Sequence, residues 1–294
     1  MTVHLRATGC FGKIPAAGDF VRQIPADGPD ARTLDWFHDG WARHALAGRQ
    51  KDLTVPLYFC WQRPGHGIAL VGAMQASRDR TGRRFPLAVF GAVAGAATTG
   101  DALAAAPDLL AGAVAVGETG RAGVDATALR GHVDALRSRL DEQGPERQAA
   151  WAAATTLGDW AGGAAEAAAR LRGLDFAFSG GGRPNFVLRG RWHGDLRHLA
   201  AGLVLLERLG GQAPAMVFWE QRDAAVEWRL SFDHAVQSQF ESLVWHPVDS
   251  PAVYDTDAVA VPEAFAGRVA PDVGGSMASF LEAADAWARG GASR

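Results

Sequence analysis

The stretch RRFPLAVFGAVAG, residues 83–95, decides the fold class of this chain. Its residues are apolar almost without interruption from Phe85 onward. A strand with one solvent-facing side alternates apolar and polar residues, whereas a nearly continuous apolar run is typical of a strand covered on both faces. The stretch therefore predicts a strand inside a sheet that helices cover on both sides.

Further strands are predicted on either side of it along the chain. LTVPLYFCW (53–61) and GIALVGAMQAS (67–77) are joined by a turn with proline and glycine, and PAMVFWE (214–220) and AVEWRLSF (225–232) by the short turn QRDA. Two strands joined by a short turn are typical of a hairpin. We therefore expect the sheet to be partly antiparallel.

Helices are predicted where apolar residues recur at helical spacing or where alanine dominates. The predicted helices span residues 28–48, 101–116, 125–140, 146–171, 195–211, 234–245 and 276–289, and short strands are expected at 3–8 and 186–189. The chain is thus predicted to be α/β, with a mixed sheet covered by helices on both faces, a three-layer α/β/α sandwich. We expect residues 1–246 to form this domain and residues 247–294 to form a C-terminal extension with a final helix.

Composition excludes several classes of function. The formal net charge of the 294 residues is −3, which argues against a dedicated nucleic-acid binder, since such domains usually carry a basic face. Cys10 and Cys60 belong to no CxxC pair, so we expect buried thiols and no zinc site. No window reaches the roughly 18 consecutive apolar residues of a membrane helix, and no leader pattern begins the chain. These features predict a cytoplasmic protein with no direct membrane insertion.

The segment FGKIPAAGDF, residues 11–20, holds a Gly-Lys pair that raises the question of a phosphate-binding loop. A P-loop requires a glycine where Ala7 stands and a serine or threonine where Ile14 stands. Pro15 also removes a backbone N–H from the place where such groups would hold phosphate. The segment is therefore interpreted as a rigid surface loop and not as a nucleotide site.

Glycines and one aspartate are expected to shape this loop. Gly9, Gly12 and Gly18 permit tight turns and positive φ. Asp19 can accept hydrogen bonds from backbone N–H groups in a turn. Loops of this kind, between regular elements, often carry recognition.

A second loop, ASRDRTGRRFPL (76–87), is rich in arginine. Arg78, Arg80, Arg83 and Arg84 bracket Asp79 and a Thr-Gly turn. Four guanidinium groups could bind a phosphate, a phosphopeptide or an acidic partner. The alternative is a solvated turn in which one arginine pairs with Asp79, and the sequence leaves both open.

Catalytic and cofactor motifs are not found. The segment SGGGRPNF (179–186) is read as a flexible loop, with an anion nest as the alternative. There is no GxSxG or HExxH motif, and the spacings of His193 to His198 and of His38 to His44 do not suit a shared metal. We therefore predict no catalytic residue, no metal and no cofactor.

Taken together, the two loops resemble motifs of the TagF family, also called ImpM, which is associated with the bacterial type VI secretion system. The family patterns are similar to G-x-x-G-K-x-P-x-x-G-D-F and S-x-D-r-x-G-R-x-F-P-l. The matching residues are Gly9, Gly12, Lys13, Pro15, Gly18, Asp19 and Phe20 in the first, and Ser77, Asp79, Arg80, Gly82, Arg83, Phe85, Pro86 and Leu87 in the second. The resemblance covers about residues 5–95, and MVFWE (216–220) resembles a later family strand in part.

The resemblance implies an α/β fold, a cytoplasmic accessory role and no enzymatic activity. Members of the family are understood as post-translational repressors that bind the forkhead-associated scaffold protein, Fha. The expected partner-binding or motif residues are Gly12, Lys13, Pro15, Gly18, Asp19, Phe20, Asp79, Arg80, Gly82, Arg83, Phe85 and Pro86.

Two hypotheses about these residues follow. In the first, Lys13, Asp19, Arg80 and Arg83 lie close together as a partner surface, with Asp79 or Asp19 holding an arginine and the motif phenylalanines fixing the loops to the core. The same residues could instead form a buried structural network needed only for folding. In the second, the arginine-rich turn belongs to a phosphate- or phosphopeptide-binding module or a hydrolase.

Overall fold

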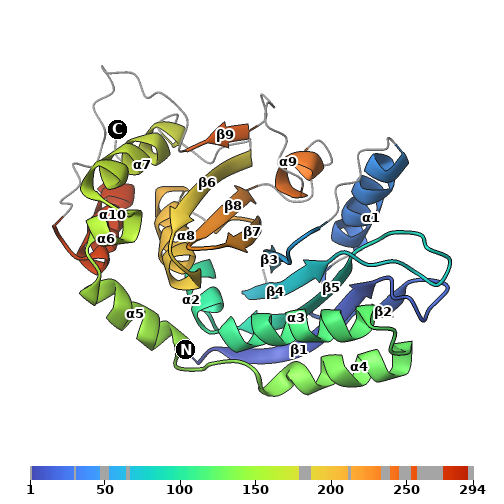
Figure 1. Cartoon of the computed structure of the whole chain (residues 1–294). Helices are drawn as coiled ribbons and strands as arrows, with labels where there is room; N and C mark the ends of the chain where they lie inside the picture. The colour runs from blue at the N-terminus through green and yellow to red at the C-terminus, as the bar shows by residue number, and fades with distance from the viewer. Residues whose placement is uncertain are drawn as a thin grey trace.

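The predicted strands lie side by side in one nine-stranded sheet in the computed structural model (Figure 1). The structure describes residues 2–29, 31–46, 53–63, 67–178, 187–210, 213–232, 239–244, 253–256 and 274–290. Within these residues the strand order is β2-β1-β5-β4-β3-β7-β8-β6-β9. Neighbouring strands are antiparallel except for the parallel pair β6–β9, so the prediction of a mixed α/β sheet is confirmed.

The elements have the following bounds. The strands are β1 His4–Gly12, β2 Val21–Gln23, β3 Leu57–Arg63, β4 Ile68–Gln75, β5 Leu87–Ala94, β6 Val187–His193, β7 Met216–Arg222, β8 Ala225–Ser231 and β9 Val253–Asp255. The helices are α1 Ala31–Leu46, α2 Thr99–Ala104, α3 Pro107–Arg121, α4 Ala126–Asp134, the 3₁₀ turn η1 Ala135–Ser138, α5 Gly144–Ala154, α6 Leu157–Ala161, α7 Ala164–Ala177, α8 Leu196–Gly210, α9 Phe240–Val244 and α10 Met277–Gly290.

Both predicted hairpins are present. β3 pairs antiparallel with β4 along all of β3, and β7 and β8 pair up to Arg222 opposite Ala225. The second turn has only two residues, and Asp223 adopts φ of 52° there. Aspartate is one of the residues that tolerates this left-handed conformation, which the tight hairpin turn requires.

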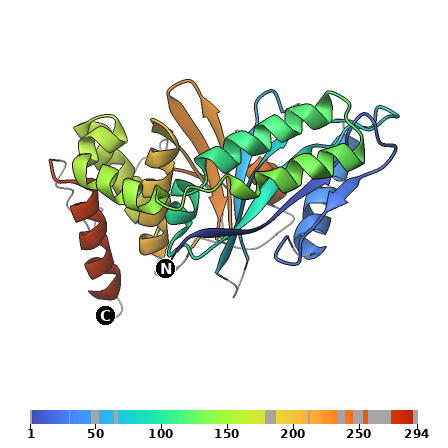
Figure 2. The same ribbon diagram turned by 90° about the horizontal axis from the view of Figure 1, so that it is seen from below.

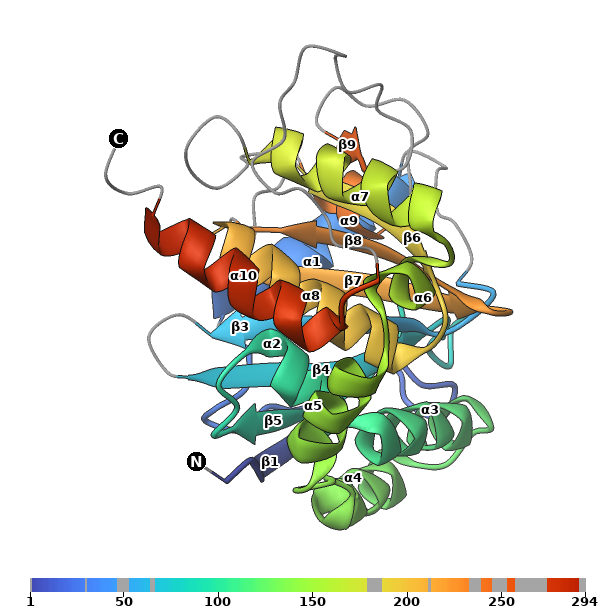
Figure 3. The ribbon, with the colours of Figure 1, turned by 90° about the vertical axis from the view of Figure 1, so that its left-hand side faces the viewer.

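The apolar run in β4 and β5 is explained by two cores on opposite faces of the sheet. Successive residues of β4 alternate between them, since Val71 and Ala73 belong to one core and Leu70 and Met74 to the other. Helices α2, α3, α4, α8 and α10 contribute to the first core. Figure 3 views the molecule from their side, and Figure 2 shows α3 and α4 side by side across the strands.

The second core is smaller and rich in aromatic rings. Trp36, Phe37 and Trp41 of α1 pack against it together with Phe240 of α9. Within the described part of the chain, α1 and the short α9 are the helices that contribute to this core. The full three-layer arrangement stays a prediction.

The helical middle of the chain differs from its prediction. Residues 101–116 were expected to form one helix, but α2 ends at Ala104 and Pro107 begins α3, because proline fits the first turn of a helix and not its interior. Residues 146–171 contain parts of three helices, α5, α6 and α7. Gly162 and Gly163, with φ of 87° and 145°, end α6 and turn the chain into α7.

The segment after residue 246 contributes to the same sheet and core. β9 pairs with β6 through Val253 opposite Val187, and Phe280 and Leu281 of α10 join the first core. The predicted boundary at residue 246 stays a prediction. The loop 179–186 and half of the helix predicted at 234–245 lie outside the described residues. None of the described helices is long and apolar enough to cross a bilayer.

Candidate functional site

The two motif segments meet at the same end of the sheet. The glycine loop, residues 12–20, follows β1, and the Asp79 turn, residues 77–85, connects β4 to β5. The backbone N–H of Arg80 donates to the carbonyl of Ala17 at 2.8 Å, and the Ser77 hydroxyl donates to the carbonyl of Lys13 at 2.6 Å. Segments more than sixty residues apart in sequence are thus joined directly, as the sequence predicts.

Gly12 is needed where the two segments touch. Its φ is 146°, and a Cβ there would lie 2.1 Å from the carbonyl oxygen of Pro86. Only glycine allows this close approach of backbone to backbone. The other two loop glycines differ from the expectation of positive φ: Gly9 is required because a Cβ would meet Gln23 and the Phe90 ring, and Gly18 has neither a positive φ nor a close contact.

Asp79 is the centre of the hydrogen-bond network. The residue is 2 % exposed. Its Oδ1 accepts from the backbone N–H of Thr81 and of Arg83, both at 2.9 Å, and from the Thr81 hydroxyl at 2.7 Å. Its Oδ2 accepts from Lys13 Nζ at 2.9 Å and Arg83 Nε at 2.7 Å. Five donors therefore satisfy one buried carboxylate, as buried charge requires.

These donors set the protonation of Asp79. Burial alone would raise the pKa of this carboxyl, but the hydrogen bonds from Thr81, Lys13 and Arg83 outweigh it and hold the pKa well below the ordinary 3.8. Asp79 stays ionised at neutral pH.

A pH dependence of stability follows from this shift. Because the pKa is lower in the folded state than in the unfolded state, the ionised carboxylate adds stability above the unfolded value and loses it as pH falls toward the folded value. We expect the difference in unfolding free energy between wild type and Asp79→Asn to be constant from neutral pH to about pH 5 and to shrink below about pH 4. Urea melts across this range measure it. An undiminished difference in strong acid would contradict the assignment.

Lys13 lies inside the site and not on its surface. It is 6 % exposed, and besides its bond to Asp79 its Nζ lies 5.1 Å from the centre of the Phe20 ring. A buried ammonium held by a carboxylate and a ring face is a structural group. For Lys13 the geometry matches the structural hypothesis.

The motif phenylalanines fix the loops to the aromatic core. Phe20 and Phe85 meet edge to face at 4.8 Å, and Phe20 stacks on Phe11 at 5.3 Å. Phe85 is buried and also meets Phe37 of α1 at 5.6 Å. These contacts place both loops on one rigid support, in the manner the sequence predicts.

Arginine side chains form the exposed part of the site. Arg83 is 61 % exposed although its Nε holds Asp79 and its Nη2 donates to the carbonyl of Gly18 at 2.7 Å. Arg80 is exposed, and its contact with the glycine loop is the hydrogen bond from its backbone N–H to the carbonyl of Ala17. Arg78 and Arg84 are exposed as well and face each other as an isolated antiparallel bridge.

The other predicted site residues, Asp19, Gly82 and Pro15, make local contacts within the two loops. Of the two acids considered for holding an arginine, Asp79 holds Arg83, whereas Asp19 accepts from the backbone N–H of Phe20 at 2.8 Å and pairs with no arginine of the described chain. Gly82 has φ of 86° and closes the turn through its N–H to the carbonyl of Asp79. Pro15 is half-buried at the start of a turn.

Two residues of the hydrogen-bond network, Thr81 and Ser77, are not among the predicted site residues. Thr81 donates twice to Asp79, and Ser77 fixes the glycine loop. An aspartate followed two residues later by threonine and then glycine is the pattern of an Asx turn, so the sequence carried a signal for Thr81. For Ser77 the only signal in the sequence is the family motif, because its hydrogen-bond partner Lys13 is remote in sequence.

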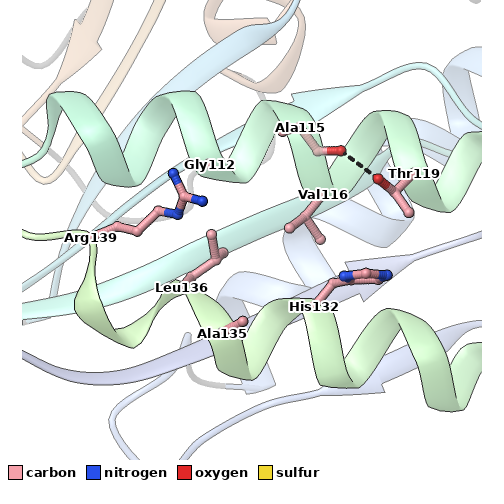
Figure 4. A pocket seen from close by; sticks show the side chains of 8 residues that line it. All are labelled: Gly112, Ala115, Val116, Thr119, His132, Ala135, Leu136 and Arg139. Atoms are coloured by element: carbon pink, nitrogen blue, oxygen red, sulfur yellow. Dashed lines mark hydrogen bonds between the residues drawn. The ribbon is translucent and has the colours of Figure 1, made fainter.

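A separate groove lies between α3 and the α4–η1 segment (Figure 4). It has a volume of about 190 Å³ and combines an apolar floor with a few polar groups. Its lining residues are Gly112, Ala115, Val116, Thr119, His132, Ala135, Leu136 and Arg139. In the described part of the chain, no cluster of three or more potential metal-binding side chains occurs there or elsewhere.

Comparison with known proteins gives one family match. Residues 9–136 match the model of the TagF N-terminal domain, described as type VI secretion system-associated. The crystal structure of PA0076 from Pseudomonas aeruginosa PAO1 is similar to this chain, with 24 % sequence identity and a TM-score of 0.36. That alignment covers 44 % of this chain and 62 % of the solved chain, so it spans less than two thirds of that protein. No curated protein matches the chain.

Proposed function

Since the chain belongs, through residues 9–136, to the TagF family of type VI secretion system-associated proteins, we propose that it is a non-enzymatic accessory protein of that system. In this proposal it acts in the cytoplasm as a post-translational repressor by binding the forkhead-associated scaffold Fha. The observation that carries it is the joined pair of motif loops, which presents exposed arginine side chains on a buried, fully hydrogen-bonded support.

The chemistry of the site supports a binding role over a catalytic one. Asp79 accepts five hydrogen bonds and its pKa is held low, so it is a poor general base. Burial raises the pKa of Cys10 to about 11 and that of Cys60 to about 12, so neither thiol is a ready nucleophile. A hydrolase that uses the arginine-rich turn would need a free nucleophile and a base, whereas the Ser77 and Thr81 hydroxyls are engaged as donors to Lys13 and Asp79.

A secretion assay tests the repressor role. Deleting the gene from a strain with an active type VI cluster should raise the amount of secreted substrate in the medium, and excess protein should lower it. The Arg172→Glu variant, altered on α7 at the far end of the sheet, should complement like wild type. Secretion that responds to neither deletion nor excess would contradict the proposal.

A further inference from the structure

The geometry points to a carboxylate clamp formed by Arg80, Arg83 and the bare backbone of Gly18. We infer that it receives an acidic side chain of the partner protein. This inference rests on the proposed function and names the chemistry by which that site would recognise its partner.

Both arginine side chains of the clamp converge on Gly18. Arg83 Nη2 donates to the Gly18 carbonyl at 2.7 Å, and a Cβ on Gly18 would lie 3.4 Å from Arg80 Nη2. The absence of a side chain at Gly18 therefore leaves the space next to the Arg80 guanidinium open, while Arg83 is held at the Gly18 carbonyl. Planar guanidinium groups placed in this way suit a carboxylate, which they can bind through paired N–H donors.

One arm of the clamp, the Arg83 side chain, is held in shape before any partner binds. Arg83 is fixed by Asp79 through Nε, and the backbone of Arg80 is fixed by Ala17. The exposed side chain of Arg83 has thus already lost much of its rotamer freedom. Binding costs less entropy when a side chain is ordered in advance.

The charge of the two loops is not balanced from within. Asp79 is buried and saturated, and Asp19 is turned toward the N–H of Phe20, at 2.8 Å. The two loops carry more basic than acidic residues on a chain whose net charge is −3. The exposed basic residues are Arg78, Arg80, Arg83 and Arg84, against the exposed Asp19, whereas Lys13 and Asp79 are buried and pair with each other. A local basic patch on an acidic protein favours an acidic partner and steers its approach.

The backbone decides between a carboxylate and a phosphate. Phosphate sites in loops usually use several backbone N–H groups that point outward as a nest. Here all five N–H groups of residues 79–83 are directed to acceptors within the protein: those of Asp79, Arg80 and Gly82 to carbonyl oxygens, and those of Thr81 and Arg83 to the Asp79 carboxylate. A ligand can therefore be bound only by the arginine side chains. This arrangement suits the carboxylate of an acidic residue better than a phosphate, which usually binds to free backbone N–H groups.

The test uses two variants that change the clamp and spare its support. Arg80→Glu reverses one charge but keeps the Asp79 network, because the side chain of Arg80 takes no part in it. Gly18→Asp places a carboxylate next to the Arg80 guanidinium, and Gly18 has no left-handed φ that would strain a side chain. Arg83 is unsuitable, since replacing it also breaks the bond to Asp79. Arg172→Glu is the matched control, on α7, which is bonded to β9 at the other end of the sheet (Figure 1).

Binding of each folded full-length protein is titrated with a heptaglutamate peptide, with inorganic phosphate and with the purified scaffold. Wild type and Arg172→Glu should bind the peptide and the scaffold with an affinity that falls as salt rises from roughly 50 to roughly 200 mM. Arg80→Glu and Gly18→Asp should each lose at least about tenfold in both affinities, which corresponds to about 1.4 kcal/mol.

The outcomes separate this inference from the proposed function. Scaffold binding that neither variant weakens overturns the clamp and leaves the proposed function standing. Peptide binding that both variants weaken, with no scaffold binding by wild type, supports the clamp and contradicts the proposed function. Tighter binding of phosphate than of peptide overturns the assignment to carboxylates.

Discussion

Gly12→Ala is expected to destabilise the protein by about 3 kcal/mol, with a fall in melting temperature of roughly 5–10 °C. Two costs combine at this position. The φ of 146° disfavours a side chain, and the new Cβ would lie 2.1 Å from the Pro86 carbonyl oxygen, which is itself backbone and has little freedom to retreat. Thermal and urea melts measure the effect.

Gly82→Ala separates the cost of the positive φ from the cost of the steric contact. Gly82 also has a positive φ, 86°, but a Cβ there would meet nothing within 4 Å. This variant should therefore lose only about 1 kcal/mol from backbone strain. Equal losses in the two variants would mean that the contact between the glycine loop and the Asp79 turn does not decide the cost.

Glu220→Gln is expected to cost about 3 kcal/mol or more through a buried ion pair on β7 and β8. Arg229 is fully buried, and its Nη2 donates to Glu220 Oε1 at 3.0 Å. Among the described residues its Nε and Nη1 have no hydrogen-bond partner, and burial lowers the pKa of the guanidinium to about 10. Removing the charge of Glu220 leaves a buried cation without its main compensation.

Two further variants test that explanation by urea melts. Glu227 contacts Arg222 at 3.8 Å and is partly exposed, so Glu227→Gln should cost under about 1 kcal/mol. The double variant Glu220→Leu/Arg229→Met should recover most of the stability, because the buried charge is gone. A double variant as unstable as Glu220→Gln would show that shape and not charge is responsible.

Most strands of the sheet could be predicted from local sequence patterns. The continuous apolar run of β5 indicated two covered faces, and short turns identified the β3–β4 and β7–β8 hairpins. The position of β3 beside β7, with Tyr58 opposite Trp219, was not readable, because strand order depends on packing between remote segments. The parallel edge strand β9 was missed for a different reason, since three residues give too short a pattern.

The sequence predicted most of the residues of the candidate site but not which of their side chains are buried. The sequence predicted that Lys13, Asp19, Arg80 and Arg83 lie close together, but Asp79 and not Asp19 joins the two loops, and the sequence could not show which residues are buried. Lys13 and Asp79 lie inside, whereas the arginine side chains lie outside. The buried part of the motif is therefore a structural network that supports exposed arginine side chains, and the partner surface stays a proposal. The depth of a long side chain depends on what covers it, and here that cover comes from Phe20 and the opposite loop.

The proposed function depends most directly on contact with the scaffold. Calorimetric titration of the purified full-length chain against the forkhead-associated scaffold from its own secretion cluster measures that contact. The account predicts saturable binding that weakens as salt rises. A correctly folded wild-type protein that shows no binding at any salt concentration would contradict it.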